Sequence, residues 1–78
     1  MTNSEFVVWC EANTLSVELA ALVLGCSRAT AFRYASNRAQ IPAIISNQCE
    51  LIDMLPAAKR LAVIQKRLGF TSKVMPDN

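Results

Sequence analysis

The chain has no histidine, only two glycines, and three cysteines that form no CxxC pair. Without histidine or a CxxC pair, most zinc sites are excluded. The sequence also lacks a glycine-rich phosphate loop and a pair of carboxylates at a spacing that suits acid–base chemistry. Cys26 is the only conceivable nucleophile, and no residue near it could activate its thiol. We therefore expect that the chain is not an enzyme and that it binds no metal, cofactor or small-molecule ligand.

Long apolar runs are absent as well, although 53% of the residues are hydrophobic. Arg28, Arg33 and Arg38 interrupt the middle of the chain, so no run reaches the ~18 residues of a membrane span. The first residues include Glu5 and no basic residue, unlike a secretory signal. The odd, widely spaced cysteines are most simply small buried residues of a reduced protein. We expect a cytoplasmic protein that does not enter a membrane.

Positive charge is missing from residues 1–27, which hold three glutamates and no lysine or arginine. All eight basic residues follow, so the two parts carry net charges of −3 and +5. A basic part of this kind fits a surface that faces a polyanion. The alternative is that these lysines and arginines are ordinary solvated side chains that face no polyanion.

Helical patterns are present in several segments, and none alternates with the period of two that strands show. Pro42 and Pro56 suit the first position of a helix, and Gly69 suits the position after the last. A chain of 78 residues has room for one domain. We expect an all-α fold, a compact bundle of about five short helices over roughly 4–12, 17–24, 28–36, 42–54 and 56–68.

Apolar residues recur at helical spacing within these segments. The segment 19–24 is apolar nearly all round, so its helix should be largely buried. The other expected core positions are Phe6, Trp9 and Cys10, then Ile45, Cys49 and Ile52, and finally a stripe of Ala57, Leu61, Ile64 and Leu68.

The stretch from Ser16 to Tyr34 is the most informative part of the chain. Ser16 is suited to cap a helix, and Gly25 can take the left-handed conformation that ends one. Ser27 can then cap a second helix that begins at Arg28. Two helices joined by so short a turn must cross steeply, which is the geometry of a helix-turn-helix motif.

The run ELAALVLGCSRATAFRYASNRAQIP resembles the Cro/lambda-repressor-like family of DNA-binding proteins. Many members begin the second helix with a glutamine that braces the recognition helix against a phosphate, and this position is Val17 here, so phosphate contacts must come from elsewhere. The elements that match are Glu18-Leu19-Ala20, Leu24-Gly25, Ser27, Arg33-Tyr34, Arg38 and Pro42, with the family's small residue at Ala21 and its buried positions at Ala20, Leu24, Cys26, Ala31 and Tyr34.

The resemblance implies a sequence-specific transcriptional regulator, a repressor of the Cro type from a phage or mobile element. It would bind a palindromic operator in double-stranded DNA as a homodimer, with helix 28–36 in the major groove. An excisionase-like architectural factor is one alternative, but such factors usually carry a wing strand and no hairpin pattern is present. A helical protein-interaction module, such as an antitoxin or adaptor, is the other; it would use the surplus of apolar residues and leave the arginines solvated.

A helical wheel divides residues 28–36 into a side that can pack on the preceding helix and a side that faces outward. The resemblance implies that the family's base-reading positions correspond to Arg28, Ala29 and Arg33 of the outward side. Phe32, on the same side, could contact a thymine methyl group or fold back into the core. Arg28 or Arg33 could instead bind a phosphate and read no base. Asn37 could instead be the left-handed residue that ends the helix. The predicted base-reading residues are Arg28, Ala29, Phe32 and Arg33, and the predicted DNA-backbone contacts are Ser27, Thr30, Ser36, Asn37 and Arg38.

We expect residues 1–69 to form the helix-turn-helix domain and residues 70–78 to form a tail. One recognition helix reads few base pairs, so the family pairs two copies about one DNA turn apart. Val63 lies away from the apolar stripe of its helix, among basic residues, as in a small interface with a polar rim. The predicted dimer interface is Val63, Phe70, Val74 and Met75; a tail folded back on its own core is the alternative.

Overall fold

Five helices make up the part of the chain that the computed structural model describes, residues 1–69, and no strand lies in that part. The predicted all-α bundle of five short helices is therefore confirmed, and its helix bounds are within one residue of the predicted ones. Pro42 and Pro56 each stand just before a helix, in the capping position, rather than at its first residue. The helices are α1 (Asn3–Ala12), α2 (Val17–Leu24), α3 (Arg28–Ala35), α4 (Ala43–Asp53) and α5 (Ala57–Leu68).

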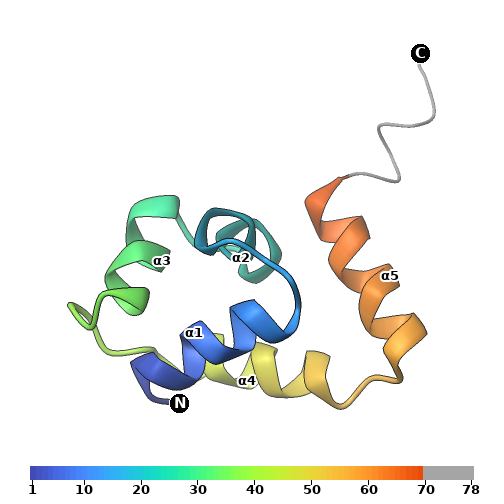
Figure 1. Cartoon of the computed structure of the whole chain (residues 1–78), viewed down its shortest axis with the longest axis horizontal. Helices are drawn as coiled ribbons and strands as arrows, with labels where there is room; N and C mark the ends of the chain where they lie inside the picture. Colours follow the sequence, from blue (N-terminus) through green and yellow to red (C-terminus); the bar gives the residue numbers. More distant parts are fainter. Residues whose placement is uncertain (70–78) are drawn as a thin grey trace.

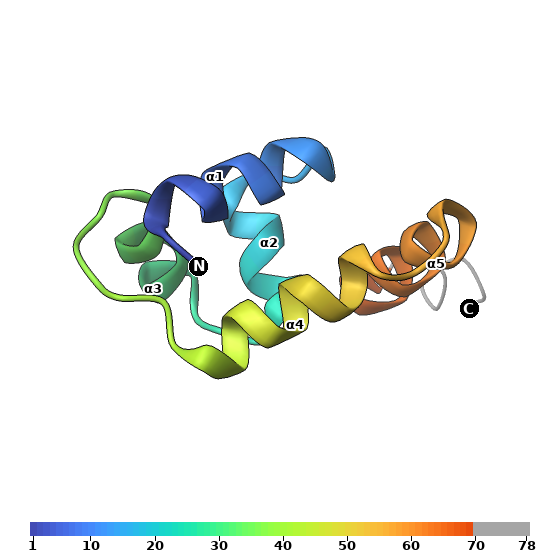
Figure 2. The same cartoon turned by 90° about the horizontal axis from the view of Figure 1, so that it is seen from below.

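Helix α2 is the centre of the fold and packs against each of the other four helices. In Figure 1, α1 and α4 lie on one side of the molecule, α2 and α3 on the other, and α5 stands at one end. Seen from the side of α1 and α4 (Figure 2), α2 lies between and behind these two helices. This arrangement leaves one side of α3 and one side of α5 without cover from the other helices of residues 1–69.

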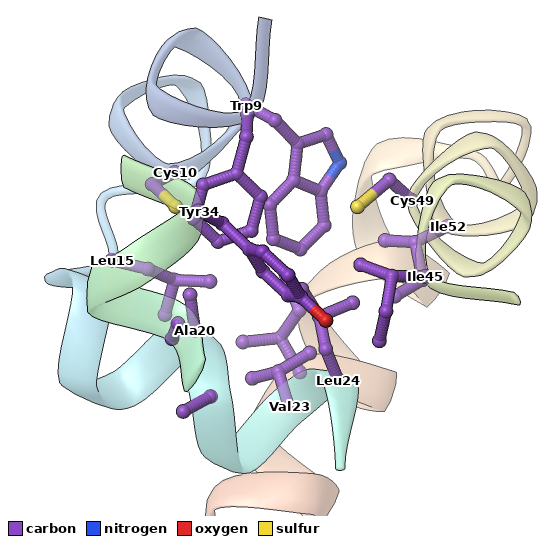
Figure 3. Packing of buried hydrophobic residues seen from close by; sticks show 14 residues of the cluster. Trp9, Cys10, Leu15, Ala20, Val23, Leu24, Tyr34, Ile45, Cys49 and Ile52 are labelled. Carbon is purple, nitrogen blue, oxygen red and sulfur yellow. The ribbon is translucent and has the colours of Figure 1, made fainter. Parts of the chain in front are cut away.

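The core joins side chains from all five helices (Figure 3). Alanines at the contact of α2 and α3 let these two helices approach closely, since Ala20 and Ala31 are fully buried. Phe6 of α1 is also fully buried and meets Tyr34 of α3 edge to face, with ring centroids 5.7 Å apart. The buried cluster is Phe6, Trp9, Cys10, Leu15, Ala20, Ala21, Val23, Leu24, Ala31, Tyr34, Ile45, Cys49, Ile52 and Ile64.

Helix α2 is largely buried, as expected, except that Leu22 is 57% exposed. The expectation for α5 is wrong, because Leu61 is 56% exposed although its stripe was expected to face the core. Ile64 is the only residue of that stripe in the buried cluster. The reason is that α5 also turns Arg67 toward the body of the protein, where its guanidinium donates to the Val23 carbonyl at 2.8 Å. The helix is rotated to satisfy this polar contact as well as the apolar one.

Local hydrogen bonds fix where the helices begin. Thr2 and Glu5 form a reciprocal capping box at α1, in which the Thr2 N–H donates to Glu5 Oε1 at 2.7 Å and the Glu5 N–H donates to Thr2 Oγ1 at 3.1 Å. Ser16 caps α2 by accepting from the Leu19 N–H at 3.2 Å. These contacts lie within a few residues of sequence, which is why the helix starts could be predicted.

The capping box should make stability depend on acid pH. The hydrogen bond from Thr2 N–H lowers the pKa of Glu5 below its ordinary 4.5. Because the folded pKa lies below the unfolded one, the stabilisation is complete above about pH 4.5 and disappears as the pH falls through the folded pKa. We expect the melting temperature of wild type to exceed that of Glu5→Gln at neutral pH, and the difference to shrink on acidification. A difference that stays constant down to about pH 3 would contradict this.

No single helix among residues 1–69 is long and apolar enough to cross a membrane. Within this part of the chain, only α1 and α2 taken together are long and apolar enough for a membrane span, and the chain bends by 94° between them. Many of the apolar side chains of this pair, among them Phe6, Trp9 and Val23, are buried in the core.

Candidate nucleic-acid interface

One side of α3 is exposed along its whole length, and the other is held by the core. Ala31 and Tyr34 are buried, as predicted for the inner side. The helix starts at a cap in which Ser27 Oγ accepts from the Thr30 N–H at 3.1 Å. The residues on the outer side, all exposed, are Arg28, Ala29, Phe32, Arg33 and Ser36. The orientation predicted from the helical wheel is therefore confirmed.

Phe32 is 48% exposed, so the alternative in which its ring folds back into the core is wrong. An aromatic ring left in water on a helix surface is available for contact with an apolar group of a partner. Arg28 lies 3.5 Å from a carboxylate oxygen of Glu18 on α2, with both side chains mostly exposed. Such a surface pair is worth about 0–1 kcal/mol, so Arg28 can readily exchange Glu18 for another anion. The Arg33 side chain makes no ion pair or hydrogen bond within residues 1–69.

The loop after α3 begins with a left-handed residue. Asn37 has φ 64, the Arg38 N–H donates to the Arg33 carbonyl at 2.8 Å, and the Asn37 N–H donates to the Tyr34 carbonyl at 3.4 Å. This is the hydrogen-bond pattern of a Schellman motif, and it confirms the helix-ending interpretation of Asn37. The Arg38 side chain is exposed just beyond this turn.

Three of the predicted backbone-contact residues already have local partners. Ser36 Oγ donates to the Phe32 carbonyl at 2.7 Å. Ser27 Oγ donates to Thr30 Oγ1 at 2.8 Å while it caps the helix. The hydroxyl protons of Ser27 and Ser36 are thus engaged within the chain, whereas the Thr30 hydroxyl still has its own proton to donate. Arg38 and Thr30 are the better donors toward an external anion.

Asn3 holds the loop that follows α3, which the sequence did not reveal. Its Nδ2 donates to the Tyr34 carbonyl at 2.7 Å and to the Ala39 carbonyl at 2.8 Å. These bonds join the start of α1 to the last turn of α3 and to the middle of the loop, on either side of Arg38, and so restrict where Arg38 can reach. An asparagine beside the helix cap Thr2 gave no sequence signal for a contact more than 30 residues away.

Arg67 and Gln48 hold the end of α2, just before the turn into α3. Arg67 Nη1 donates to the Val23 carbonyl at 2.8 Å and to Gln48 Oε1 at 2.6 Å, and Gln48 Nε2 donates to the Leu24 carbonyl at 3.4 Å. A cation is favourable at the carboxyl end of a helix, where carbonyls carry partial negative charge. Arg67 was expected on a basic rim of α5, and instead it is turned toward α2.

Replacing Arg67 with methionine should lower the free energy of unfolding by about 1 kcal/mol, since the side chain is partly exposed and two hydrogen bonds are lost. Arg67→Lys keeps the charge but loses the planar fork of the guanidinium, so its free energy of unfolding should lie between those of wild type and Arg67→Met. Urea unfolding followed by circular dichroism measures both. Equal stability of all three proteins would show that these bonds contribute nothing.

The three free cysteines lie in or beside the core. Burial raises the pKa of the Cys10 thiol to about 11 and that of the Cys49 thiol to about 12, so both are protonated at neutral pH. Both are almost completely buried, which confirms that they are small core residues. Cys26 is half-buried in the turn between α2 and α3, and burial raises its pKa as well. A protonated thiol is a poor nucleophile.

The predicted dimer interface is only partly within the described residues. Val63 is half-buried in its own chain rather than standing on an open surface. Phe70, Val74 and Met75 lie outside the described residues.

Comparisons with protein-family models, with curated proteins and with solved structures found no match for this chain. The resemblance of residues 18–42 to the Cro/lambda-repressor-like family therefore stays a hypothesis that depends on the residues themselves. What the geometry offers is a short exposed helix surface with two guanidinium groups, one aromatic ring and a small residue between them.

Proposed function

We propose that this chain is a sequence-specific DNA-binding transcriptional regulator that places the exposed side of α3 in the major groove of double-stranded DNA. The observation that carries the proposal is the outer side of α3, where Arg28, Phe32 and Arg33 are exposed on a helix fixed by the core. An arginine fork matches the O6 and N7 acceptors of guanine, and a phenylalanine ring can pack on a thymine methyl group.

The ends of α3 support the same function. The Ser27 cap accepts from the Thr30 N–H, and the positive end of the helix dipole at this terminus favours a phosphate oxygen. Arg38 is exposed past the other end, in a loop that Asn3 holds in place. Contacts at both ends would fix the helix in the groove, while the residues between them read bases. The specific form we propose is a small cytoplasmic repressor of the Cro type that binds a palindromic operator as a homodimer.

Selection of bound duplexes from a random pool tests this proposal directly. We expect an enriched motif with two inverted half-sites about one DNA turn apart. Retention on duplex DNA should also fall steeply with salt, because each phosphate contact releases counterions. No enrichment and no salt-dependent retention would overturn the proposal.

A protein-interaction module is the second candidate, because several large apolar side chains are exposed away from α3. They include Val8 of α1 at 62% and Ile44 of α4 at 69%. Such a module would ignore duplex DNA at any salt concentration, so the same retention experiment separates the two candidates. An excisionase-like factor is less well supported, since the usual wing needs a strand and residues 1–69 contain none.

Arg38→Ala should weaken binding to operator and to unrelated DNA about equally. Its side chain lies in the loop after α3, from which it can reach the phosphate backbone but rarely the floor of a groove. The slope of log K against log salt should fall by roughly one unit. Competition titrations at several salt concentrations measure both effects, and a loss confined to one base position would contradict the assignment.

A further inference from the structure

A groove of about 630 Å³ runs between α1 and the end of α4. Two of its lining side chains are strongly exposed apolar residues, Val8 at 62% and Met54 at 73%. The nearly buried Trp9 also lines it, and the Trp9 indole N–H donates to Asp53 Oδ1 at 2.9 Å. The groove is therefore a formed surface with apolar side chains left in water, which favours a docking site.

The rim of this groove is acidic. Glu5 of α1 and Glu50 and Asp53 of α4 line it, and no lysine or arginine of residues 1–69 does. An occupant must therefore combine an apolar side with positive charge.

The exposed side of α5 has this chemistry. Leu61 is 56% exposed there, beside the short exposed side chains of Ala58 and Ala62. Lys59 and Lys66 are exposed on the same helix and lie together along one edge of this apolar strip. The inner side of α5 is already used, because Ile64 packs in the core.

We propose that α5 of a second copy docks in the α1–α4 groove, and that two copies exchange this contact reciprocally about a two-fold axis. Leu61 of one copy would contact Val8 and Met54 of the other, with lysines near the acidic rim. Direct pairing of α5 with α5 would instead bring like charges together, which is unfavourable. Within one chain, α5 lies beyond the end of α4, so it does not fill its own groove (Figure 2).

This dimer leaves the outer side of α3 uncovered, because α1 and α4 lie on the other side of the molecule from α2 and α3 (Figure 1). The inference goes beyond the proposed DNA binding and does not depend on it, since two copies can exchange α5 in the absence of DNA. Its test therefore uses the full chain without DNA, so a failure here is distinguishable from a failure to bind an operator.

Sedimentation equilibrium of two variants, alone and mixed, tests the exchange. Met54→Lys damages the groove and leaves α5 intact, whereas Leu61→Glu damages α5 and leaves the groove intact. Each variant alone should dimerise at least about tenfold more weakly than wild type, the equivalent of 1.4 kcal/mol. An equimolar mixture should associate again, because one of its two contacts is intact and the other brings the introduced lysine and the introduced glutamate, which have opposite charges, together. Circular dichroism melting shows that each variant is folded, as the exposure of both side chains leads us to expect.

Ile44→Lys is the matched control, since Ile44 is 69% exposed on α4 but does not line the groove. It should dimerise as wild type does. A wild-type chain that stays monomeric at tens of micromolar overturns the proposal. So does a dimer that Leu61→Glu weakens and Met54→Lys does not, which would indicate pairing of α5 with α5. Failure of the mixture to associate overturns the reciprocal exchange.

Discussion

Phe6→Ala should remove most of the free energy of unfolding of this small domain. Phe6 is fully buried, and its ring packs edge to face on Tyr34 with centroids 5.7 Å apart. Removing a buried aromatic side chain costs about 3–5 kcal/mol, through lost transfer energy and the cavity that remains. Small domains are typically stable by only about 5–15 kcal/mol, and a chain of this size lies toward the lower end.

Urea and thermal unfolding followed by circular dichroism measure the loss. Phe6→Leu is the matched comparison, since it keeps most of the apolar volume and should lose far less stability. Because Phe6 joins α1 to α3, the fraction of Phe6→Ala able to bind DNA should fall with its folded fraction. A Phe6→Ala protein that melts within a few degrees of wild type would show that the contact between α1 and α3 is not central to the fold.

Arg33→Ala should weaken binding to the selected operator by about 1–3 kcal/mol and relax the preference at one base pair. Arg33 lies in the middle of the exposed side of α3, and no carboxylate of residues 1–69 pairs with it. Its guanidinium is therefore available to a guanine, whereas Arg28 must first leave Glu18. Unlike the change at Arg38, this one should alter which sequence is preferred.

The measurement is a repeat of the selection with the variant, together with competition titrations on single-base operator variants. Arg33→Lys separates charge from shape, because lysine keeps the charge and loses the fork. We expect Arg33→Lys to retain binding to unrelated DNA and to lose the preference at the same base pair. An unchanged sequence profile with only a shallower salt slope would reassign Arg33 to a phosphate.

The contrast between local and distant contacts explains which features could be predicted. The caps at Thr2, Ser16 and Ser27 join residues only three positions apart, so the sequence contains both partners within one turn. Gly25, with φ 78, ends α2 for a reason equally local, the absence of a Cβ. The outward side of α3 followed from helix geometry alone, since 3.6 residues per turn fixes which side chains share a face.

The prediction for Phe32 shows the limit of such reasoning. Periodicity placed its ring on the outward side of α3 and left open whether the ring folded back into the core. The structure decides this, because Ala31 and Tyr34 occupy the contact with the core and leave the ring 48% exposed. The same limit applies to Asn3, whose partner carbonyls at Tyr34 and Ala39 lie far along the chain.

The sequence by itself determined the five helices, their ends and the exposed side of α3, because each depends on residues within a turn or two. Only the tertiary structure decided the rotation of α5, with Leu61 turned out and Arg67 turned in. An apolar stripe predicts which side of a helix tends to be buried, but not that a carbonyl of Val23, 44 residues away, needs a donor. Every helix leaves its last carbonyls without a helical partner, but only the packing of α5 against α2 brings Arg67 to this one, so the pairing cannot be found along the chain.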